Sequence, residues 1–271
     1  MNRENGEAMP RFCANLTMLF NEVEFMDRFE AAARAGFRGV EFLYPYQWPK
    51  EQLLEALNRN GLEQVLHNVP SGDWTGGERG IACLPGREAE FRDGVGLALE
   101  YATAIGCKQL NCLVGITPEG VDPDKLRQTL IENLQFAASA LAGEGVRLLI
   151  EPLNSFDIPG FLLTSTRDTL ALLDQAGHPN IQLQYDVYHM QKMEGNLIDT
   201  ITSNIGRIAH FQVADNPGRH EPGTGEINYS NLFESIDGTG YTGWIGCEYV
   251  PHTTTAASLK WLEPYGIKGG N

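Results

Sequence analysis

Short apolar segments alternate along this chain with longer amphipathic ones. Residues 12–15, 39–42, 64–67, 109–113, 147–151, 182–186, 208–213 and 244–248 have the apolar content of buried strands. Between them, residues 23–36, 49–61, 90–106 and 123–145 show helical spacing and end in glycine, which is a helix-termination signal. Strands that alternate with helices form parallel sheets, and eight such units in 271 residues predict a closed (β/α)₈ TIM barrel, an α/β fold.

An open, doubly wound sheet would show the same alternation, but no G-x-G-x-x-G follows the first strand. We find no linker or break in composition. We therefore expect one domain over residues 9–267, with a flexible tail at 1–8 and a short tail at 268–271. Two connections, 69–86 and 214–230, are unusually long. Both leave the C-terminal ends of predicted strands, where barrel enzymes carry their sites.

The charge and the cysteines narrow the class of protein. The formal net charge of −15 argues against binding to a polyanion, so we expect no nucleic-acid partner. No apolar stretch is long enough to span a membrane, and the polar N-terminus does not resemble a secretory signal. The five cysteines are an odd number at irregular spacing, which favours a reduced, cytoplasmic protein.

Four polar residues interrupt the last four predicted strands, each about one strand–helix unit after the one before: Glu151, Asp186, Gln212 and Glu248. A barrel brings such positions to one rim. Buried carboxylates are costly unless they are paired or bound to a cation, so three at one rim predict a metal site. Oxygen ligands without a thiolate favour Mg²⁺ or Mn²⁺ over Zn²⁺.

Long segments of the chain, from about Met9 to Ile267, resemble the hydroxypyruvate isomerase family of the xylose-isomerase-like barrels. The most specific are RFCANLTMLF, AGFRGVEFLYPY, LIEPLN, YDVYHMQKMEG, ADNPGRHEPGTGEINY and GWIGCEY. The resemblance implies an isomerase that interconverts hydroxypyruvate and tartronate semialdehyde through an enediolate. It also implies that Glu151 and Glu248 are the proton-transfer pair. Related ketose epimerases carry a histidine where this chain has Gln212, so the three carboxylates are the better-founded metal ligands.

The substrate of such an enzyme carries a carboxylate, which needs local cations in so acidic a chain. Arg219 in the second long connection is the first candidate, and Arg79 and Arg87 in the first are further ones. By resemblance to the epimerases, His189 contacts a substrate oxygen. His67, at the end of the third strand, is a further candidate for substrate binding. Glu41 could orient His67 or another rim group, and a structural role is equally open.

Other functions remain open at this stage. A 2-oxo-tetronate isomerase or a ketose 3-epimerase would share the metal and the glutamate pair. A DNA-repair endonuclease on the same barrel would need a metal cluster rich in histidines and a basic groove, which the composition disfavours. A noncatalytic small-molecule-binding barrel would have no use for two facing glutamates. The resemblance leaves a homo-oligomer open.

Overall fold

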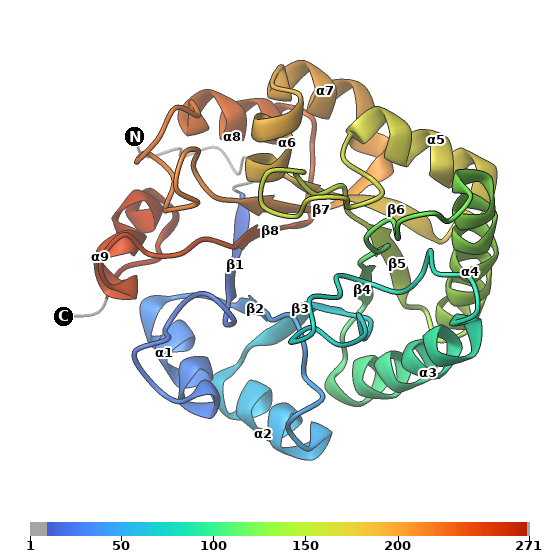
Figure 1. Ribbon diagram of the computed structural model, residues 1–271. Coiled ribbons are helices and arrows are strands. Elements are labelled where there is room, and N and C mark those ends of the chain that lie inside the picture. The colour runs from blue at the N-terminus through green and yellow to red at the C-terminus, as the bar shows by residue number, and fades with distance from the viewer. Residues whose placement is uncertain (1–9, 270–271) are drawn as a thin grey trace.

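The computed structural model describes residues 10–269 and shows a closed barrel of eight parallel strands with helices outside it (Figure 1). Each strand pairs with its neighbours in chain order, and the last closes onto the first. The predicted fold class is thereby confirmed, and each predicted strand agrees within one residue at either end. The strands are β1 (Arg11–Asn15), β2 (Gly39–Glu41), β3 (Glu63–Asn68), β4 (Gln109–Cys112), β5 (Arg147–Ile150), β6 (Ile181–Asp186), β7 (Ile208–Val213) and β8 (Trp244–Cys247).

Helices cover the outer face of the barrel and bury one face each against it. In α1, for example, Phe29, Ala32 and Ala35 are buried at a spacing of three residues. The α-helices are α1 (Arg28–Ala35), α2 (Lys50–Asn60), α3 (Glu88–Ile105), α4 (Pro123–Gly143), α5 (Thr166–Ala176), α6 (Val187–Met193), α7 (Leu197–Asn204), α8 (Tyr229–Gly238) and α9 (Thr255–Ser258). Short 3₁₀ helices are η1 (Phe25–Asp27), η2 (Ile205–Arg207) and η3 (Leu259–Tyr265).

The interior of the barrel changes from apolar to polar along the strands. Five buried residues form its apolar end: Cys13, Val65, Leu66, Leu149 and Trp244. Toward the C-terminal ends the buried side chains become polar, beginning with Glu41 in β2. Gly246 in β8 leaves space for this carboxylate, since a Cβ there would overlap its oxygens. The polar end is therefore the place for a site.

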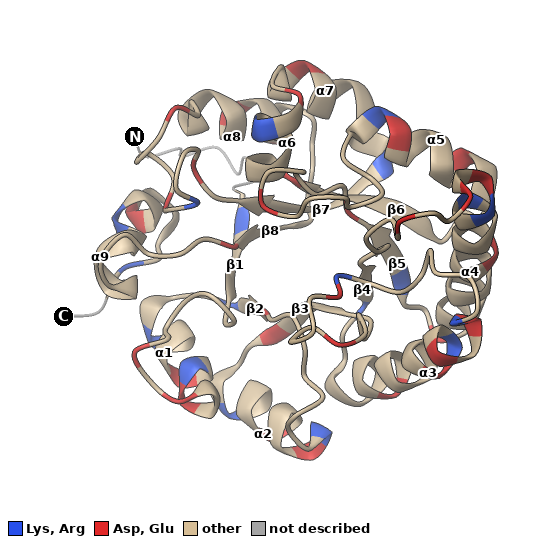
Figure 2. Ribbon diagram, in the orientation of Figure 1, with Lys and Arg blue, Asp and Glu red and all other residues tan. Residues whose placement is uncertain are grey.

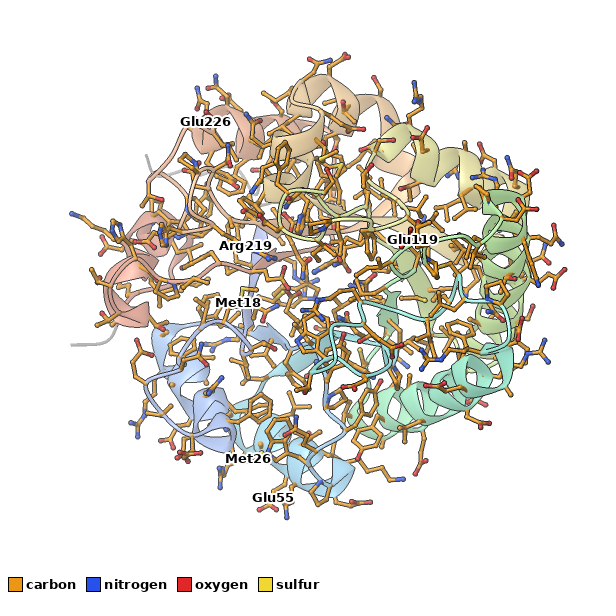
Figure 3. The ribbon with its side chains drawn as sticks, viewed as in Figure 1. Met18, Met26, Glu55, Glu119, Arg219 and Glu226 are labelled. Carbon is orange, nitrogen blue, oxygen red and sulfur yellow. The ribbon has the colours of Figure 1, made fainter. Side chains whose placement is uncertain are left out.

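The long connections that follow β3 and β7 in the sequence lie at that polar end. Charged residues are spread over the outer helices (Figure 2). Arg219, from the connection behind β7, lies toward the middle of the barrel, whereas Glu55 of α2 lies at its outer edge (Figure 3). Within residues 10–269, no helix combines the length and the apolar character needed to cross a membrane.

The predicted tail at residues 1–8 lies outside the described residues, as do residues 270 and 271. In the segment predicted as the C-terminal tail, the Lys268 backbone N–H donates a hydrogen bond to the Ala35 carbonyl at 2.8 Å. Contact with the barrel's helical layer therefore continues past residue 267.

Candidate active site

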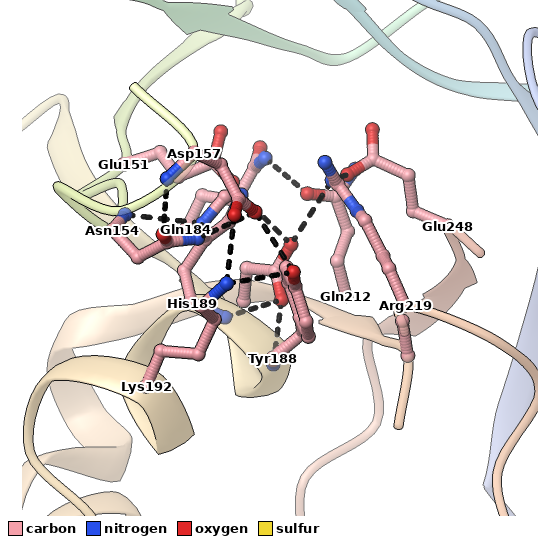
Figure 4. Close-up of polar contacts among 12 residues, drawn as sticks. Glu151, Asn154, Asp157, Gln184, Tyr188, His189, Lys192, Gln212, Arg219 and Glu248 are labelled. Atoms are coloured by element: carbon pink, nitrogen blue, oxygen red, sulfur yellow. Dashed lines mark hydrogen bonds and ion pairs between the residues drawn. The ribbon is translucent and has the colours of Figure 1, made fainter. Parts of the chain in front are cut away.

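Three acidic side chains gather at the C-terminal ends of the strands. Glu151 follows β5, Asp186 ends β6 and Glu248 follows β8, and none is more than 4% exposed. Because β5 and β8 lie apart around the closed barrel, Glu151 and Glu248 approach the site from different sides (Figure 4). The structure thus brings together the three carboxylates that the sequence placed at strand ends.

Hydrogen bonds hold the two glutamates in place. Asn111 Nδ2 in β4 donates to Glu151 Oε2 at 2.8 Å. Asn15 Nδ2 in β1 donates to Glu248 Oε1 at 3.1 Å, and Arg219 Nη2 donates to Glu248 Oε2 at 2.6 Å. Each glutamate is therefore oriented by a neighbouring strand or loop.

The acidity of both glutamates departs from that of a carboxyl in water. Burial, followed by the nearby negative charges of Glu248 and Asp186, raises the pKa of Glu151 well above its ordinary value. Burial also raises the pKa of Glu248 to about 8, although Arg219 opposes the rise. A pair of carboxyls with raised pKa values can hold and release a proton near neutral pH.

Asp186 accepts hydrogen bonds through only one of its two carboxylate oxygens. Its Oδ1 accepts hydrogen bonds from the backbone N–H groups of Tyr188, at 2.7 Å, and His189, at 3.3 Å, and so caps α6. Its Oδ2 is buried and has no hydrogen-bond partner. A buried carboxylate oxygen in this state is stabilised by a cation.

Gln212, in β7, lies between the three acidic side chains and the buried carboxylate of Glu41. Its Nε2 donates to Glu41 Oε1 at 2.8 Å, and its Oε1 accepts from Gln184 Nε2 at 2.6 Å. These two bonds fix the orientation of the amide and leave one lone pair of Oε1 unused.

Glu41 forms the floor of the site. Of the roles left open by the sequence, it does not orient His67 but binds other polar residues of the barrel interior. It accepts hydrogen bonds from His210, Gln212 and Asn15, at 2.7, 2.8 and 3.0 Å. Burial alone would raise its pKa, but His210 and these hydrogen bonds lower it below the ordinary value. Glu41 is thus an ionised structural carboxylate.

Arg219 reaches the acidic group from the connection between β7 and α8. Its backbone has a φ of 58°, and its guanidinium lies 5.3 Å above the ring of Tyr188. Besides its bond to Glu248, Nη2 lies 3.8 Å from Asp186 Oδ2, whereas Nε is buried without a hydrogen-bond partner. The first candidate among the arginines therefore lies in the site.

His189 lies beside Asp186, and its Nε2 is 3.7 Å from Asp186 Oδ2. Its Nδ1 contacts Asn154, whose backbone nitrogen is 3.1 Å away and whose side-chain nitrogen is 2.7 Å away. Burial lowers the pKa of His189 to about 4, so the ring is neutral at physiological pH.

His67 does not join this group. In the pairing of β3 with β4, Asn68 is opposite Asn111, which faces Glu151, and His67 is opposite Leu110. Since side chains alternate along a strand, the His67 ring points outward, where Tyr46 packs at 6.1 Å. The inward position that the sequence assigned to His67 belongs to the residue after it.

Arg79 and Arg87 differ in whether an acidic side chain pairs with them. Arg87 forms ion pairs with Glu78 and Glu90 at the start of α3. Arg79 lies 3.9 Å above the ring of Trp74 and, among the described residues, has no carboxylate partner. Its guanidinium therefore has a charge that no described acidic group balances.

Three further histidines lie in loops. His220 and His252 stack on each other with ring centroids 4.8 Å apart, and His178 Nδ1 accepts a hydrogen bond from the backbone of Asn180.

Sequence reasoning missed four amides that organise the site. Asn15 and Asn111 bind the two glutamates, Gln184 binds Gln212, and Asn154 binds His189. The first three carry a signal that could have been used, because each is a polar residue within or at the end of an otherwise apolar strand. Asn154 lies in a loop, where hydrophobic patterning gives no such signal.

The donor set fits a divalent cation. Glu151 and Asp186 each offer a carboxylate oxygen, these oxygens lie within 4.8 Å of each other, and Asp186 Oδ2 has no hydrogen-bond partner. Three carboxylates lie beside the Arg219 guanidinium, and burial, together with the neighbouring negative charges, raises the pKa values of the two glutamates.

Comparisons with known proteins place the chain in a family. A family model described as xylose isomerase-like TIM barrel matches residues 29–265. Hydroxypyruvate isomerase of Escherichia coli (strain K12) is 58% identical over 257 residues, which cover 95% of this chain and 100% of that protein. A 2-oxo-tetronate isomerase of Cupriavidus necator is 50% identical over 95% of this chain and 99% of its own. A crystal structure of an AP endonuclease, family 2, from Brucella melitensis superposes with a TM-score of 0.93 at 46% identity, covering 95% of this chain and 99% of that one.

The fold and the site define a (β/α)₈ barrel with buried carboxylates at the C-terminal ends of its strands. Within that class, the chain belongs to the xylose isomerase-like TIM barrel family, and there to the hydroxypyruvate isomerase group of isomerases.

Proposed function

We propose that this isomerase interconverts hydroxypyruvate and tartronate semialdehyde (2-hydroxy-3-oxopropanoate). The observation that carries the proposal is the pair of buried glutamates with raised pKa values, in a chain 58% identical along its length to hydroxypyruvate isomerase of Escherichia coli. The reaction moves hydrogen between adjacent carbons. A base takes a proton from the hydroxyl-bearing carbon, an enediolate forms, and an acid gives a proton to the neighbouring carbon. The hydroxyl proton passes from the first oxygen to the second, so that the hydroxyl becomes the carbonyl and the carbonyl becomes the hydroxyl.

Glu151 and Glu248 are the proposed base and acid. Transfer requires one carboxylate and one carboxylic acid on different sides of the substrate, and the raised pKa of each glutamate makes this mixed state accessible near neutral pH. Asn111 and Asn15 keep the two carboxyl groups oriented while their protonation changes.

Glu151, Asp186, Gln212 and Glu248 would hold one divalent metal, Mg²⁺ or Mn²⁺. When bound, such a cation supplies Lewis-acid stabilisation of the negative charge that develops on substrate oxygens. The unpartnered Asp186 Oδ2 and the free lone pair of Gln212 support this ligand set.

Arg219, His189 and Arg79 are the proposed substrate-binding residues. The unpartnered Nε of Arg219 offers an N–H to the substrate carboxylate, and Arg79 supplies a second cation on the connection behind β3. His67 is left out, because its ring faces the helical layer.

The test is turnover of hydroxypyruvate by the purified protein with Mg²⁺ or Mn²⁺, linked to tartronate semialdehyde reductase. We expect turnover that falls to background in EDTA and returns when the metal is added back. An inactive metal-loaded protein would contradict the proposal.

A 2-oxo-tetronate isomerase is the second candidate, because the Cupriavidus necator enzyme of that name is 50% identical to this chain. Parallel reactions with a 2-oxo-tetronate, and with a ketose for the epimerase alternative, each followed by ¹H NMR of its own product, rank the substrates by kcat/KM. Turnover of any of them also excludes a noncatalytic binding barrel.

Nucleic-acid chemistry has less support. The net charge is −15, and of the six histidines only His189 lies within the acidic group, while His210 binds Glu41 beneath it. We therefore propose a small-molecule enzyme of the cytoplasm, without a nucleic-acid or membrane partner. A homo-oligomer remains compatible with this function.

A further inference from the structure

The side chain of Asn154, in the loop after β5, has only one orientation that satisfies its neighbours. Its Oδ1 accepts hydrogen bonds from the backbone N–H groups of Phe156, at 3.1 Å, and Asp157, at 2.8 Å. A backbone N–H can only donate, so the atom that faces both must be the amide oxygen. The amide nitrogen is thereby assigned without ambiguity.

That nitrogen places its two hydrogens on two acceptors. One points to Asp157 Oδ2 at 3.0 Å, and the other points to His189 Nδ1 at 2.7 Å. The same Asp157 carboxylate accepts from Tyr188 Oη at 2.8 Å and from Lys192 Nζ at 2.7 Å, which holds it in place (Figure 4).

His189 Nδ1 therefore faces two donors. Besides the Asn154 side chain, the Asn154 backbone N–H points at it from 3.1 Å. A nitrogen that faces two donors has to present a lone pair, so the hydrogen of the neutral ring is on Nε2. This nitrogen is the one that lies 3.7 Å from Asp186 Oδ2, on the side of the acidic group.

We propose that Asn154 is a positioning residue that holds His189 as the neutral Nε2–H tautomer, so that the ring presents a hydrogen-bond donor to a substrate oxygen. In this role His189 is neither a metal ligand through Nε2 nor a proton shuttle, and proton transfer is left to the two glutamates. The tautomer follows from the contacts alone, whereas its use toward a substrate oxygen rests on the proposed function.

The test is a long-range ¹H–¹⁵N correlation spectrum of protein labelled with ¹⁵N-histidine, recorded at neutral pH in the Mg²⁺-loaded and EDTA-treated forms. A His189→Gln spectrum assigns the signals of His189 among the six histidines. We expect the pattern of a neutral ring with an unprotonated Nδ1 and a protonated Nε2 in both forms. An Nδ1–H tautomer or an imidazolium in the wild-type protein would overturn the proposal.

Two variants separate positioning from simple packing. Asn154→Asp keeps the oxygen that the Phe156 and Asp157 backbones bind, but it replaces the donor at His189 Nδ1 with an acceptor. We expect Nδ1 to gain a proton and kcat/KM to fall about tenfold, as for one lost neutral hydrogen bond. Asp157→Asn is the matched control, because it leaves both donors to Nδ1 and should keep the wild-type tautomer. An unchanged tautomer in folded Asn154→Asp would contradict the positioning role.

The spectra separate this inference from the proposed function. They need no turnover, so the expected tautomer in a protein that is inactive on hydroxypyruvate would refute the substrate assignment alone. The wild-type spectrum also decides the tautomer if Asn154→Asp does not fold.

Discussion

The buried carboxylates of this barrel differ in their hydrogen-bond partners and in the charges around them. Glu41 accepts hydrogen bonds from His210, Gln212 and Asn15, and its pKa is lowered. Glu151 and Glu248 lie among like charges, and their pKa values are raised. Groups with perturbed acidity and unbalanced charge mark functional sites more often than structural ones. The contrast therefore separates Glu41, at the floor of the site, from the proposed acid–base pair.

His67 makes the protein sensitive to acid. Burial lowers its pKa to about 3 from an ordinary value of 6.5. Between these two pH values His67 is therefore protonated in the unfolded chain but neutral in the folded one. Its contribution to stability is fully present above pH 6.5 and is lost as the pH falls toward 3. Between pH 7 and pH 5 the loss is about 2 kcal/mol in the free energy of unfolding.

Urea unfolding at the two pH values measures this loss. We expect the free energy of unfolding of His67→Asn to fall by that much less than the wild type between pH 7 and pH 5. Substitution of the half-buried loop residue His178, in His178→Asn, should leave the wild-type loss unchanged. Equal losses in the wild type and His67→Asn would show that His67 does not titrate in this way.

Among the strands, β8 is adapted to the side chain that β2 sends into the barrel. A Cβ at Gly246 would overlap the Glu41 carboxylate, so Gly246→Ala has to displace the residue that orients Gln212 and Asn15. We expect a loss of about 1–3 kcal/mol in the free energy of unfolding, together with weaker metal binding.

Gly96→Ala is the matched control for this substitution. Gly96 lies within α3 with open space where a Cβ would be, so alanine should stabilise the protein by about 0.5–1 kcal/mol. Thermal unfolding and calorimetric metal titration compare the two variants. A Gly246→Ala protein with wild-type stability and metal affinity would contradict the packing argument.

The strands could be predicted because the pattern of apolar residues along the chain follows burial. The strand-end carboxylates could be predicted because the strand–helix unit repeats around the barrel and brings equivalent positions to one rim. It misplaced His67 by one residue, since strand pairing decides which face a side chain takes. It could not show that Arg79 stacks on Trp74 or that Arg219 reaches Glu248, because loop conformation carries no periodic signal. The sequence therefore predicted the site residues that lie on strands better than those that lie in loops.

At the scale of the whole molecule, the protein has to concentrate negative charge around its proposed metal within a chain of net charge −15. The raised pKa values of Glu151 and Glu248 favour protonation of both without metal, whereas a bound cation favours an ionised ligand and the proposed reaction keeps one of the two glutamates as the acid. Metal binding should therefore release about one proton near pH 7, and affinity should rise with pH.

Calorimetric titration with Mg²⁺ in two buffers of different ionisation enthalpy counts the released protons. We expect Glu248→Gln, which cannot titrate at that position, to release fewer. Binding without proton release, and with the same affinity at pH 6 and pH 8, would contradict the proposed ligand set.

The central claim is that Glu151 and Glu248 together move the proton. The most direct measurement is the conversion of hydroxypyruvate, followed by ¹H NMR, with Mg²⁺-loaded wild type, Glu151→Gln and Glu248→Gln, each shown by calorimetry to bind the metal. The account predicts conversion by the wild type and at least about 100-fold slower conversion by each variant. A metal-loaded glutamine variant that converts the substrate within tenfold of the wild-type rate would show that its glutamate is not part of the proton-transfer pair.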